Sequence, residues 1–153
     1  MRKHKFVDWF EVITICKTFT QTCNDRNIND FTDIVAIARG GLIPAQILAY
    51  RMKIPKIHSY GIKFYKDERL DDDPIVYQTP EEVFSDGHIL VVDEVCDSGK
   101  TFEYVIDDLL SNNPASTVTT FCLHYKPCST YKPDFVGETV DSKIWIDYPW
   151  DKE

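Results

Sequence analysis

Two acidic residues and a small polar turn stand together between an apolar run and a helical pattern. Asp93 and Glu94 follow the apolar residues 89–92, and a glycine-containing turn occupies residues 97–101. The backbone N–H groups of such a turn, placed ahead of a helix, provide a binding surface for an anion. We therefore expect the turn to wrap a phosphate group and the two carboxylates to hold a ribose or a metal ion.

Two elements must position these groups. Residues 89–92 are few, apolar and rich in β-branched side chains, which is typical of a buried strand. After the turn, apolar residues recur at helical spacing, which predicts a helix with one buried face. These residues are Phe102, Val105, Ile106, Leu109 and Leu110.

The stretch from Val91 to Thr101 resembles the phosphoribosyl pyrophosphate (PRPP) motif of the type I phosphoribosyltransferases. That motif is an apolar strand, two acids, two variable residues and Asp-Thr/Ser-Gly-x-Thr. A P-loop and a G-x-G-x-x-G fingerprint are both absent from the sequence. Without the resemblance, an ordinary strand, turn and helix with solvated acids would also fit. The resemblance implies that PRPP is bound by Asp93, Glu94, Val95, Cys96, Asp97, Ser98, Gly99, Lys100 and Thr101.

The resemblance also implies separate roles within the motif. Asp93 and Glu94 would bind the ribose hydroxyls, and Glu94 is the better candidate to contact Mg²⁺ directly or through water. The family commonly has Asp-Asp here, so the longer Glu94 changes the metal geometry. Asp97 would be the catalytic base that accepts the N7 proton of a purine. Cys96 and Lys100 occupy positions that vary in the family. We expect the side chain of Cys96 to fill space and the backbone N–H of Lys100 to act as a donor.

A glycine pair follows the predicted strand of residues 34–38. Glycine lets backbone amides approach an anion closely, and Arg39 adds a positive charge. The resemblance assigns Arg39 and Gly40 to the pyrophosphate of PRPP; alone, they indicate a tight turn with a surface arginine. It also assigns Arg69 to cover the pyrophosphate when a loop closes, although a solvated charge explains Arg69 equally well.

The C-terminal part resembles the xanthine–guanine branch of the 6-oxopurine phosphoribosyltransferases. Lys126 precedes a proline, as does the lysine of that branch that donates to the 6-oxo group of the base. Adenine carries a donor at that position, so Lys126 would select oxopurines. The W-I-x-x-P-W-D/E tail of the branch implies that Trp145 stacks on the purine and that the main chain of Ile146 contacts its edge. Without the resemblance, Lys126 would be a solvated cation and the aromatic residues core, and we expect Trp150 to be structural.

Helical and strand patterns alternate along the chain. The alternation predicts an α/β fold with a mainly parallel twisted sheet flanked by helices, and ligands at the carboxyl ends of the strands. The resemblance adds a small C-terminal hood. Residues 66–80 are predicted to be a mobile surface loop with a short strand at 75–77. The predicted helices cover residues 9–25 and 42–52, and the other predicted strands cover residues 57–65, 117–125, 135–136 and 143–148.

Length and composition limit the classes of protein. With 153 residues, 43% of them hydrophobic, we expect one domain over residues 1–153 with a base-binding tail near 126–151. A formal net charge of −8 disfavours a nucleic-acid binder. The sequence has no apolar run of 18 residues, so we expect no membrane span. Five cysteines without a C-x-x-C pair favour a reduced, cytoplasmic protein. The histidines that lack metal-ligand spacing, and are expected to be structural, are His58, His88 and His124.

The resemblance implies an enzyme of purine salvage that uses Mg²⁺. It would transfer 5-phosphoribose from PRPP to N9 of guanine, xanthine or hypoxanthine and release pyrophosphate. It also implies a homodimer or homotetramer. Two alternatives stay open: a PRPP-sensing regulatory protein of the same fold, and a phosphoribosyltransferase for another base. Lys126 and the pair Trp145-Ile146 favour the enzyme over the sensor, but the sequence does not rank the three bases.

Overall fold

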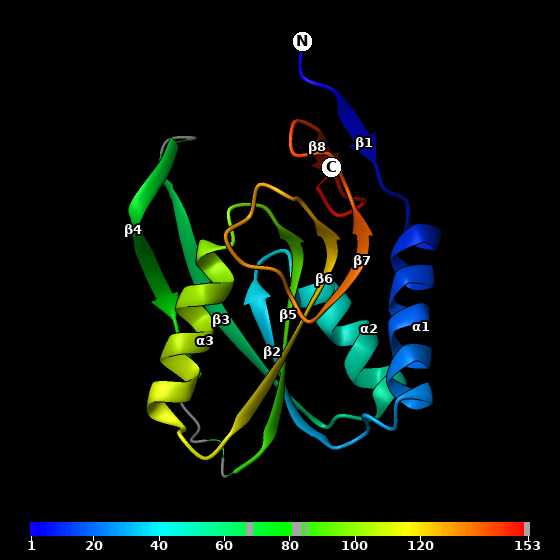
Figure 1. Ribbon diagram of the computed structural model, residues 1–153, viewed down its shortest axis with the longest axis vertical. Helices are drawn as coiled ribbons and strands as arrows, with labels where there is room; N and C mark the ends of the chain where they lie inside the picture. Colours follow the sequence, from blue (N-terminus) through cyan, green and yellow to red (C-terminus); the bar gives the residue numbers. More distant parts are fainter. Residues whose placement is uncertain (67–68, 81–83, 85, 152–153) are drawn as a thin grey trace.

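The central element is a twisted sheet of six strands (Figure 1). The computed structural model describes residues 1–66, 69–80, 84 and 86–151, with the side chains of residues 65, 66 and 69–72 left aside. The order across the sheet is β4 (Arg69–Gln78), β3 (Lys56–Lys66), β2 (Phe31–Ala38), β5 (His88–Cys96), β6 (Thr117–Tyr125) and β7 (Phe135–Thr139).

The strand directions place several loops at one edge of the sheet. β2 pairs in parallel with β3 and β5, and β6 pairs in parallel with β5 and β7, whereas only β4 is antiparallel to its neighbour in the described sheet. The helix α2 (Leu42–Met52) connects β2 to β3, and α3 (Lys100–Asn112) connects β5 to β6. The carboxyl ends of β2, β5 and β6 therefore lie side by side, and the predicted mainly parallel α/β fold is confirmed.

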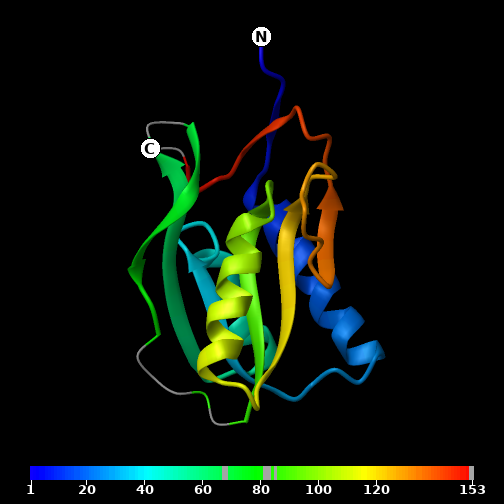
Figure 2. The same cartoon turned by 60° about the vertical axis from the view of Figure 1, so that its left-hand side comes forward.

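Helices cover both faces of the sheet. The helix α1 (Trp9–Asp25) packs with α2 on one face, and α3 packs on the other (Figures 1 and 2). Each face carries its own hydrophobic cluster. In β5, Leu90 and Val92 belong to the cluster under α1 and α2, while Ile89 and Val91 belong to the cluster under α3. A strand buried on both faces explains why this run is continuously apolar instead of alternating.

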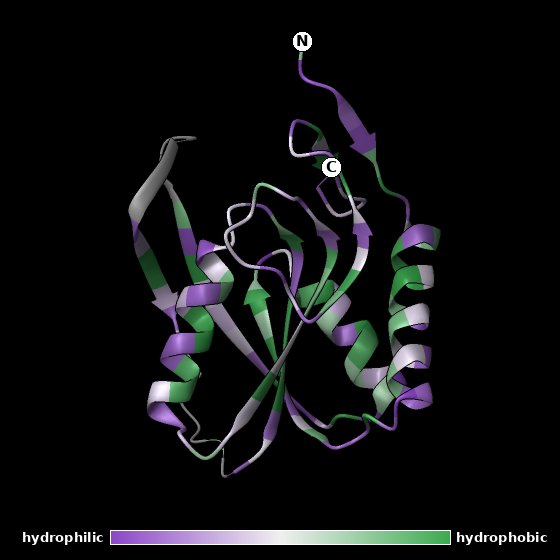
Figure 3. Ribbon diagram, in the orientation of Figure 1, coloured by the Kyte–Doolittle hydropathy of each residue, from purple (hydrophilic) through white to green (hydrophobic). Residues whose placement is uncertain are grey.

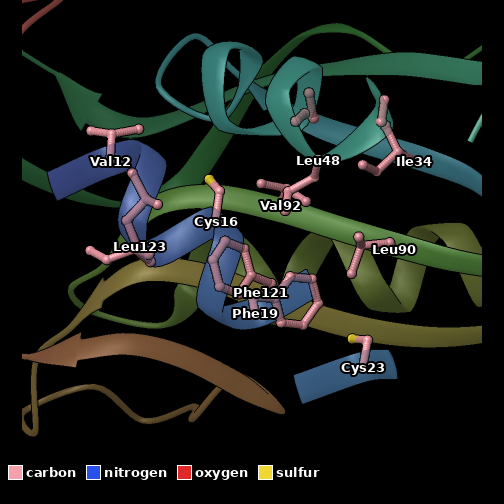
Figure 4. Packing of buried hydrophobic residues seen from close by; sticks show 14 of the residues in the cluster. Val12, Cys16, Phe19, Cys23, Ile34, Leu48, Leu90, Val92, Phe121 and Leu123 are labelled. Atoms are coloured by element: carbon pink, nitrogen blue, oxygen red, sulfur yellow. The ribbon is translucent and has the colours of Figure 1, made fainter. Parts of the chain in front are cut away.

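The core under α1 is tightly interleaved (Figure 4). Cys16 and Phe19 of α1 reach the sheet, where the ring of Phe19 stacks on Phe121 with 4.3 Å between centroids. Leu48 of α2 is fully buried beside them. In Figure 3, the green of hydrophobic residues is accordingly found on the central strands and on the sides of the helices that face the sheet. In α3, where the sequence predicted one buried face, the buried residues are Phe102, Val105 and Leu109, as predicted.

The ends of the described chain meet in a small second sheet. The strand β1 (His4–Phe6) pairs in parallel with β8 (Trp145–Asp147), above the carboxyl ends of the main sheet (Figure 1). The main chain extends the pairing, because Trp145 N–H donates to the carbonyl of Lys3 at 2.8 Å. The predicted hood is therefore built from both ends of the chain. β1 was not predicted, because its basic residues carry no apolar alternation.

The structure differs from the prediction for residues 66–80. β3 and β4 form an antiparallel hairpin, while residues 67 and 68 lie outside the described part of the chain. The sequence predicted a strand only at 75–77, because prolines and acidic residues are rare in strands. An edge strand accepts both, since one of its sides needs no hydrogen-bond partner. The mobility of this hairpin stays a prediction.

Across the residues that the structure describes, none of the helices combines the length and the apolar character that crossing a bilayer requires.

Leu90 provides a test of the two-sided core. Its side chain is fully buried in the central strand β5. Leu90→Ala should lower the free energy of unfolding by about 2–5 kcal/mol, because it leaves a cavity between sheet and helices. Urea unfolding measures the change. Tyr50→Ala serves as the control, since Tyr50 is 83% exposed, and an equal loss in both variants would contradict the assignment of the core.

Candidate active site

A cleft of about 1000 Å³ opens between the carboxyl ends of the main sheet and the hood. Loops that follow β2, β5 and β6 line it from one side, and β8 lines it from the other. Of the residues predicted for PRPP and the base, Lys100 does not line the cleft, and the side chain of Arg69 lies outside the described residues. The predicted residues that do line it are Arg39, Gly40, Asp93, Glu94, Val95, Cys96, Asp97, Ser98, Gly99, Thr101, Lys126, Trp145 and Ile146.

The turn after β5 is shaped to receive an anion. Gly99 precedes α3 with a φ of 87°, a left-handed conformation that L side chains rarely adopt. Among the described residues, the N–H groups of Ser98, Gly99 and Thr101 find no acceptor, while Lys100 N–H donates to Ser98 Oγ at 3.3 Å. Free amides at a helix N-terminus attract negative charge. The geometry of the turn therefore fits a phosphate group, and phosphate binding there stays a prediction.

The acidic pair lies deep in the cleft. Glu94 N–H donates to Asp93 Oδ1 at 2.7 Å, and Glu94 Oε2 accepts a hydrogen bond from Trp150 Nε1 at 2.8 Å. Burial raises the pKa of Glu94 to about 7, and the charge of Asp151 adds to the increase. Burial, together with the charge of Glu94, also raises the pKa of Asp93 well above its usual range. Binding a cation would favour the ionised form of both carboxyl groups.

The donor set fits a magnesium ion. Two adjacent carboxyl groups offer oxygen ligands, which Mg²⁺ prefers, and leave room for water and substrate oxygens. The carboxyl group of Glu94 also lies against Gly40, because a Cβ added to Gly40 would collide with it. Glu94 thus connects the end of β5 with the predicted pyrophosphate loop at Arg39 and Gly40.

Asp97 and Lys126 form an ion pair at the ends of β5 and β6. Lys126 Nζ lies 3.1 Å from Asp97 Oδ2, and Lys126 is only 5% exposed. Lys126 N–H also donates to the carbonyl of Cys96 at 3.0 Å, which fixes the start of the loop after β6. A buried lysine needs such a partner, because an isolated buried charge is costly. The predicted base and the predicted 6-oxo donor therefore occupy one site.

The hood presents the tail residues to this site. Trp145 is 45% exposed at the cleft, and the guanidinium of Arg2 lies 4.7 Å from its ring centroid. The side chain of Ile146 is buried. Trp145 and Asp147 carry the ladder hydrogen bonds to β1, so the alternating N–H and C=O of Ile146 point away from that strand. Those main-chain groups are available to a ligand.

Sequence reasoning missed three neighbours of the cleft. Arg2 enters it because β1 pairs with β8, which no local pattern indicated. Tyr148 and Trp150 contact Glu94, although Trp150 was expected only to be structural. The O–H of Tyr148 and the N–H of Trp150 were the signal that could have indicated these contacts. A buried Tyr or Trp usually donates to an acceptor, so each of the two needed a partner nearby.

Cys96 and His124, which were expected to be structural, lie in surroundings that fit such a role. Cys96 is buried, and burial raises the pKa of its thiol to about 11, so it fills space. His124, Glu11 and Glu138 bring possible metal-binding atoms within 4.8 Å of one another. The ammonium group of Lys5 already lies 3.1 Å from Glu11 and 3.4 Å from Glu138, so an ion-pair cluster explains this arrangement.

Comparison with known proteins gives a consistent result. A family model of the phosphoribosyl transferase domain matches residues 5–153. The chain is 32% identical over 119 residues to a xanthine-guanine phosphoribosyltransferase of Cereibacter sphaeroides, covering 77% of this chain and 68% of that protein. A protein of the same name from Gluconobacter oxydans is 34% identical over 122 residues, covering 79% and 69%. The crystal structure of a purine phosphoribosyltransferase from Pyrococcus horikoshii superposes with a TM-score of 0.85 at 27% identity, covering 100% of this chain and 96% of that one.

The raised pKa of Glu94 predicts a pH-dependent stability. Between pH 4.5, the usual carboxyl value, and about 7, folded Glu94 keeps a proton that the unfolded chain has released. Stability should therefore fall as the pH rises through this window. Glu94→Gln stays neutral, so its melting temperature should exceed that of the wild type at about pH 8 and approach it at about pH 5.

Thermal unfolding across this pH range measures the difference. Asp107→Asn is the matched control, because Asp107 is exposed on α3. If the gain from Glu94→Gln were the same at every pH, the carboxyl group would not titrate in this window.

Proposed function

The chain belongs to the phosphoribosyltransferase family, and we propose that it transfers 5-phosphoribose from PRPP to N9 of a 6-oxopurine, releasing pyrophosphate. The observation that carries the proposal is the pair of Lys126 Nζ and Asp97 Oδ2, 3.1 Å apart in the same cleft as the phosphate-binding turn. This pair offers one donor and one acceptor to adjacent atoms of a purine. The names of the relatives, which are purine phosphoribosyltransferases, support the same substrate class.

PRPP is bound by the edge of the sheet. The turn of Ser98, Gly99 and Thr101 receives the 5′-phosphate with amides and hydroxyl groups, while Asp93 and Glu94 accept hydrogen bonds from the ribose hydroxyls. Arg39 and Gly40 bind the pyrophosphate. Mg²⁺, held near Asp93 and Glu94, would offset the charge of the leaving pyrophosphate.

The base is bound between the sheet and the hood. Lys126 donates to the 6-oxo group, and its ammonium carries three donors, so it can keep its contact with Asp97 at the same time. Trp145 stacks on one face of the purine. The main chain of Ile146 contacts the edge that is remote from Lys126.

The proton leaves the purine through Asp97. As the bond from C1′ to pyrophosphate lengthens, positive charge grows on the sugar, and N9 attacks it. Asp97 accepts the proton from N7, which restores the neutral purine. The hairpin of β3 and β4 carries Arg69, and we propose that it closes over the pyrophosphate to exclude water from the activated sugar.

The rival function is a PRPP-sensing regulator with the same fold. Such a protein needs the turn and Arg39 but has no use for a purine-binding lysine. The near-complete burial of Lys126 beside Asp97 favours the enzyme, because a buried cation is costly to keep without a function.

Incubation with PRPP, Mg²⁺ and one base at a time tests the proposal. Pyrophosphate should be released with guanine, xanthine or hypoxanthine. It should not be released with adenine, whose 6-amino group is a donor like Lys126, or with uracil, which lacks the N7 and N9 atoms of a purine. PRPP binding without turnover of any base would favour the regulator. Turnover of adenine at a similar rate would remove Lys126 from base selection.

Asp97→Asn should separate chemistry from binding. The substitution keeps the shape of the side chain but removes the base, so kcat should fall by about 10²–10⁴-fold. The KM for PRPP should change by less than about threefold, since the phosphate turn stays intact. Steady-state kinetics measure both values, with Asp107→Asn as a control for the same chemical change outside the cleft. An unchanged kcat would exclude Asp97 as the base.

A further inference from the structure

We propose that Trp150 is a positioning residue that holds the carboxyl group of Glu94 in place for PRPP, with Tyr148 fixing the main chain of the same residue. The inference rests on the proposed function, and it extends that function to a segment expected to be only structural. It joins the tail that presents the base-binding residues to the acidic pair that binds the sugar.

The first contact is made to the side chain of Glu94. Trp150 Nε1 donates to Glu94 Oε2 at 2.8 Å, within charge-assisted hydrogen-bond distance for an ionised carboxylate. Glu94 Oε1 accepts no hydrogen bond from the residues that the structure describes, and the carboxyl group lies over Gly40. Trp150 therefore holds one oxygen and leaves the other to a ligand between the motif and the pyrophosphate loop.

The second contact is made to the main chain of Glu94. Tyr148 is 2% exposed, and its hydroxyl group donates to the carbonyl of Glu94 at 3.0 Å. Since that single proton is used, the hydroxyl oxygen accepts from His124 Nδ1, which lies at 2.9 Å. The hydroxyl group of Tyr148 thus has two hydrogen-bond partners, Glu94 and the buried His124, which fix the orientation of the ring.

Aromatic packing holds the two tail residues in register. The rings of Tyr148 and Trp150 are nearly parallel, with an interplanar angle of 4° and 4.9 Å between centroids. The ring of Trp9 in α1 packs against Trp150 at a tilt, with 5.7 Å between centroids. Tyr148 N–H donates to Asp151 Oδ2 at 2.9 Å, which closes the turn. The donor at Trp150 Nε1 is therefore preorganised by the hood.

Glu94 needs such a holder for a chemical reason. The family commonly has an aspartate at this position, and glutamate adds one methylene and one rotatable bond. A longer side chain has more rotamers to lose when it must present a carboxylate in one geometry. The hydrogen bond from Trp150 selects one of these rotamers before PRPP arrives, which reduces the cost of binding.

Trp150→Phe tests the inference, because phenylalanine keeps a ring against Tyr148 but lacks the N–H. The Kd for PRPP with Mg²⁺ should rise by about tenfold, the effect of losing one charge-assisted hydrogen bond. The KM for the base and kcat should stay within about threefold. Trp9→Phe is the matched control, since Trp9 contacts the same stack without touching Glu94, and its Kd for PRPP should stay within about twofold.

A double-mutant cycle shows whether the effect passes through Glu94. In a Glu94→Ala background, Trp150→Phe should change the Kd for PRPP by less than about twofold. An equal rise in both backgrounds, an unchanged Kd in the wild-type background, or an equal rise in the KM for the base would overturn the proposal. If Trp150→Phe does not fold, Tyr148→Phe decides instead: it must raise the Kd for PRPP, or the proposal fails.

The proposed function fails in a different way. A wild-type protein that releases no pyrophosphate with any 6-oxopurine would contradict that function. A wild type that is active, together with a neutral Trp150→Phe, would contradict only the positioning role.

Discussion

The parallel pairing of β2, β5 and β6 is the constraint on which the rest of the structure depends. Parallel strands all end at the same edge, so the loops that begin at Arg39, Asp97 and Lys126 meet although they are far apart in the sequence. The arrangement requires helices on both faces, because each crossover covers one side of the sheet. The two hydrophobic clusters are the energetic consequence, and the cleft is the geometric one.

The electrostatic character of the cleft depends on the groups that line it and not on the net charge of the chain. The chain has a formal net charge of −8, yet its cleft presents Arg39 and the backbone amides of the turn to an anion, while the charge of Lys126 is paired with Asp97. Burial raises the pKa of Asp93 and Glu94, which limits the negative charge that they carry before a ligand binds. The acidic pair can therefore stand next to the turn that is predicted to bind phosphate without cancelling the attraction of its amides for an anion.

The hood, which pairs β1 with β8, forms one wall of this cleft. Two strands of three residues each are not stable alone, so their arrangement depends on contacts with the main domain. The aromatic stack of Trp9, Tyr148 and Trp150 and the buried His124 supply those contacts. The segment that carries Trp145 is consequently attached to Glu94 through Tyr148 and Trp150.

The sequence by itself determined the α/β class, the order of most elements and the position of the glycine turn before α3. These follow from local causes: the apolar run of β5, the spacing of the helices, and a glycine before α3 that can take a φ of 87°. It also indicated Lys126 and Trp145 through resemblance. Only the tertiary structure decided what these residues touch. The pairing of β1 with β8, the strand β4 on a charged edge, the ion pair of Lys126 with Asp97, and the contact of Trp150 with Glu94 join residues that are distant in the chain. No local pattern encodes such contacts, because each depends on where the folded sheet and its helices place both partners.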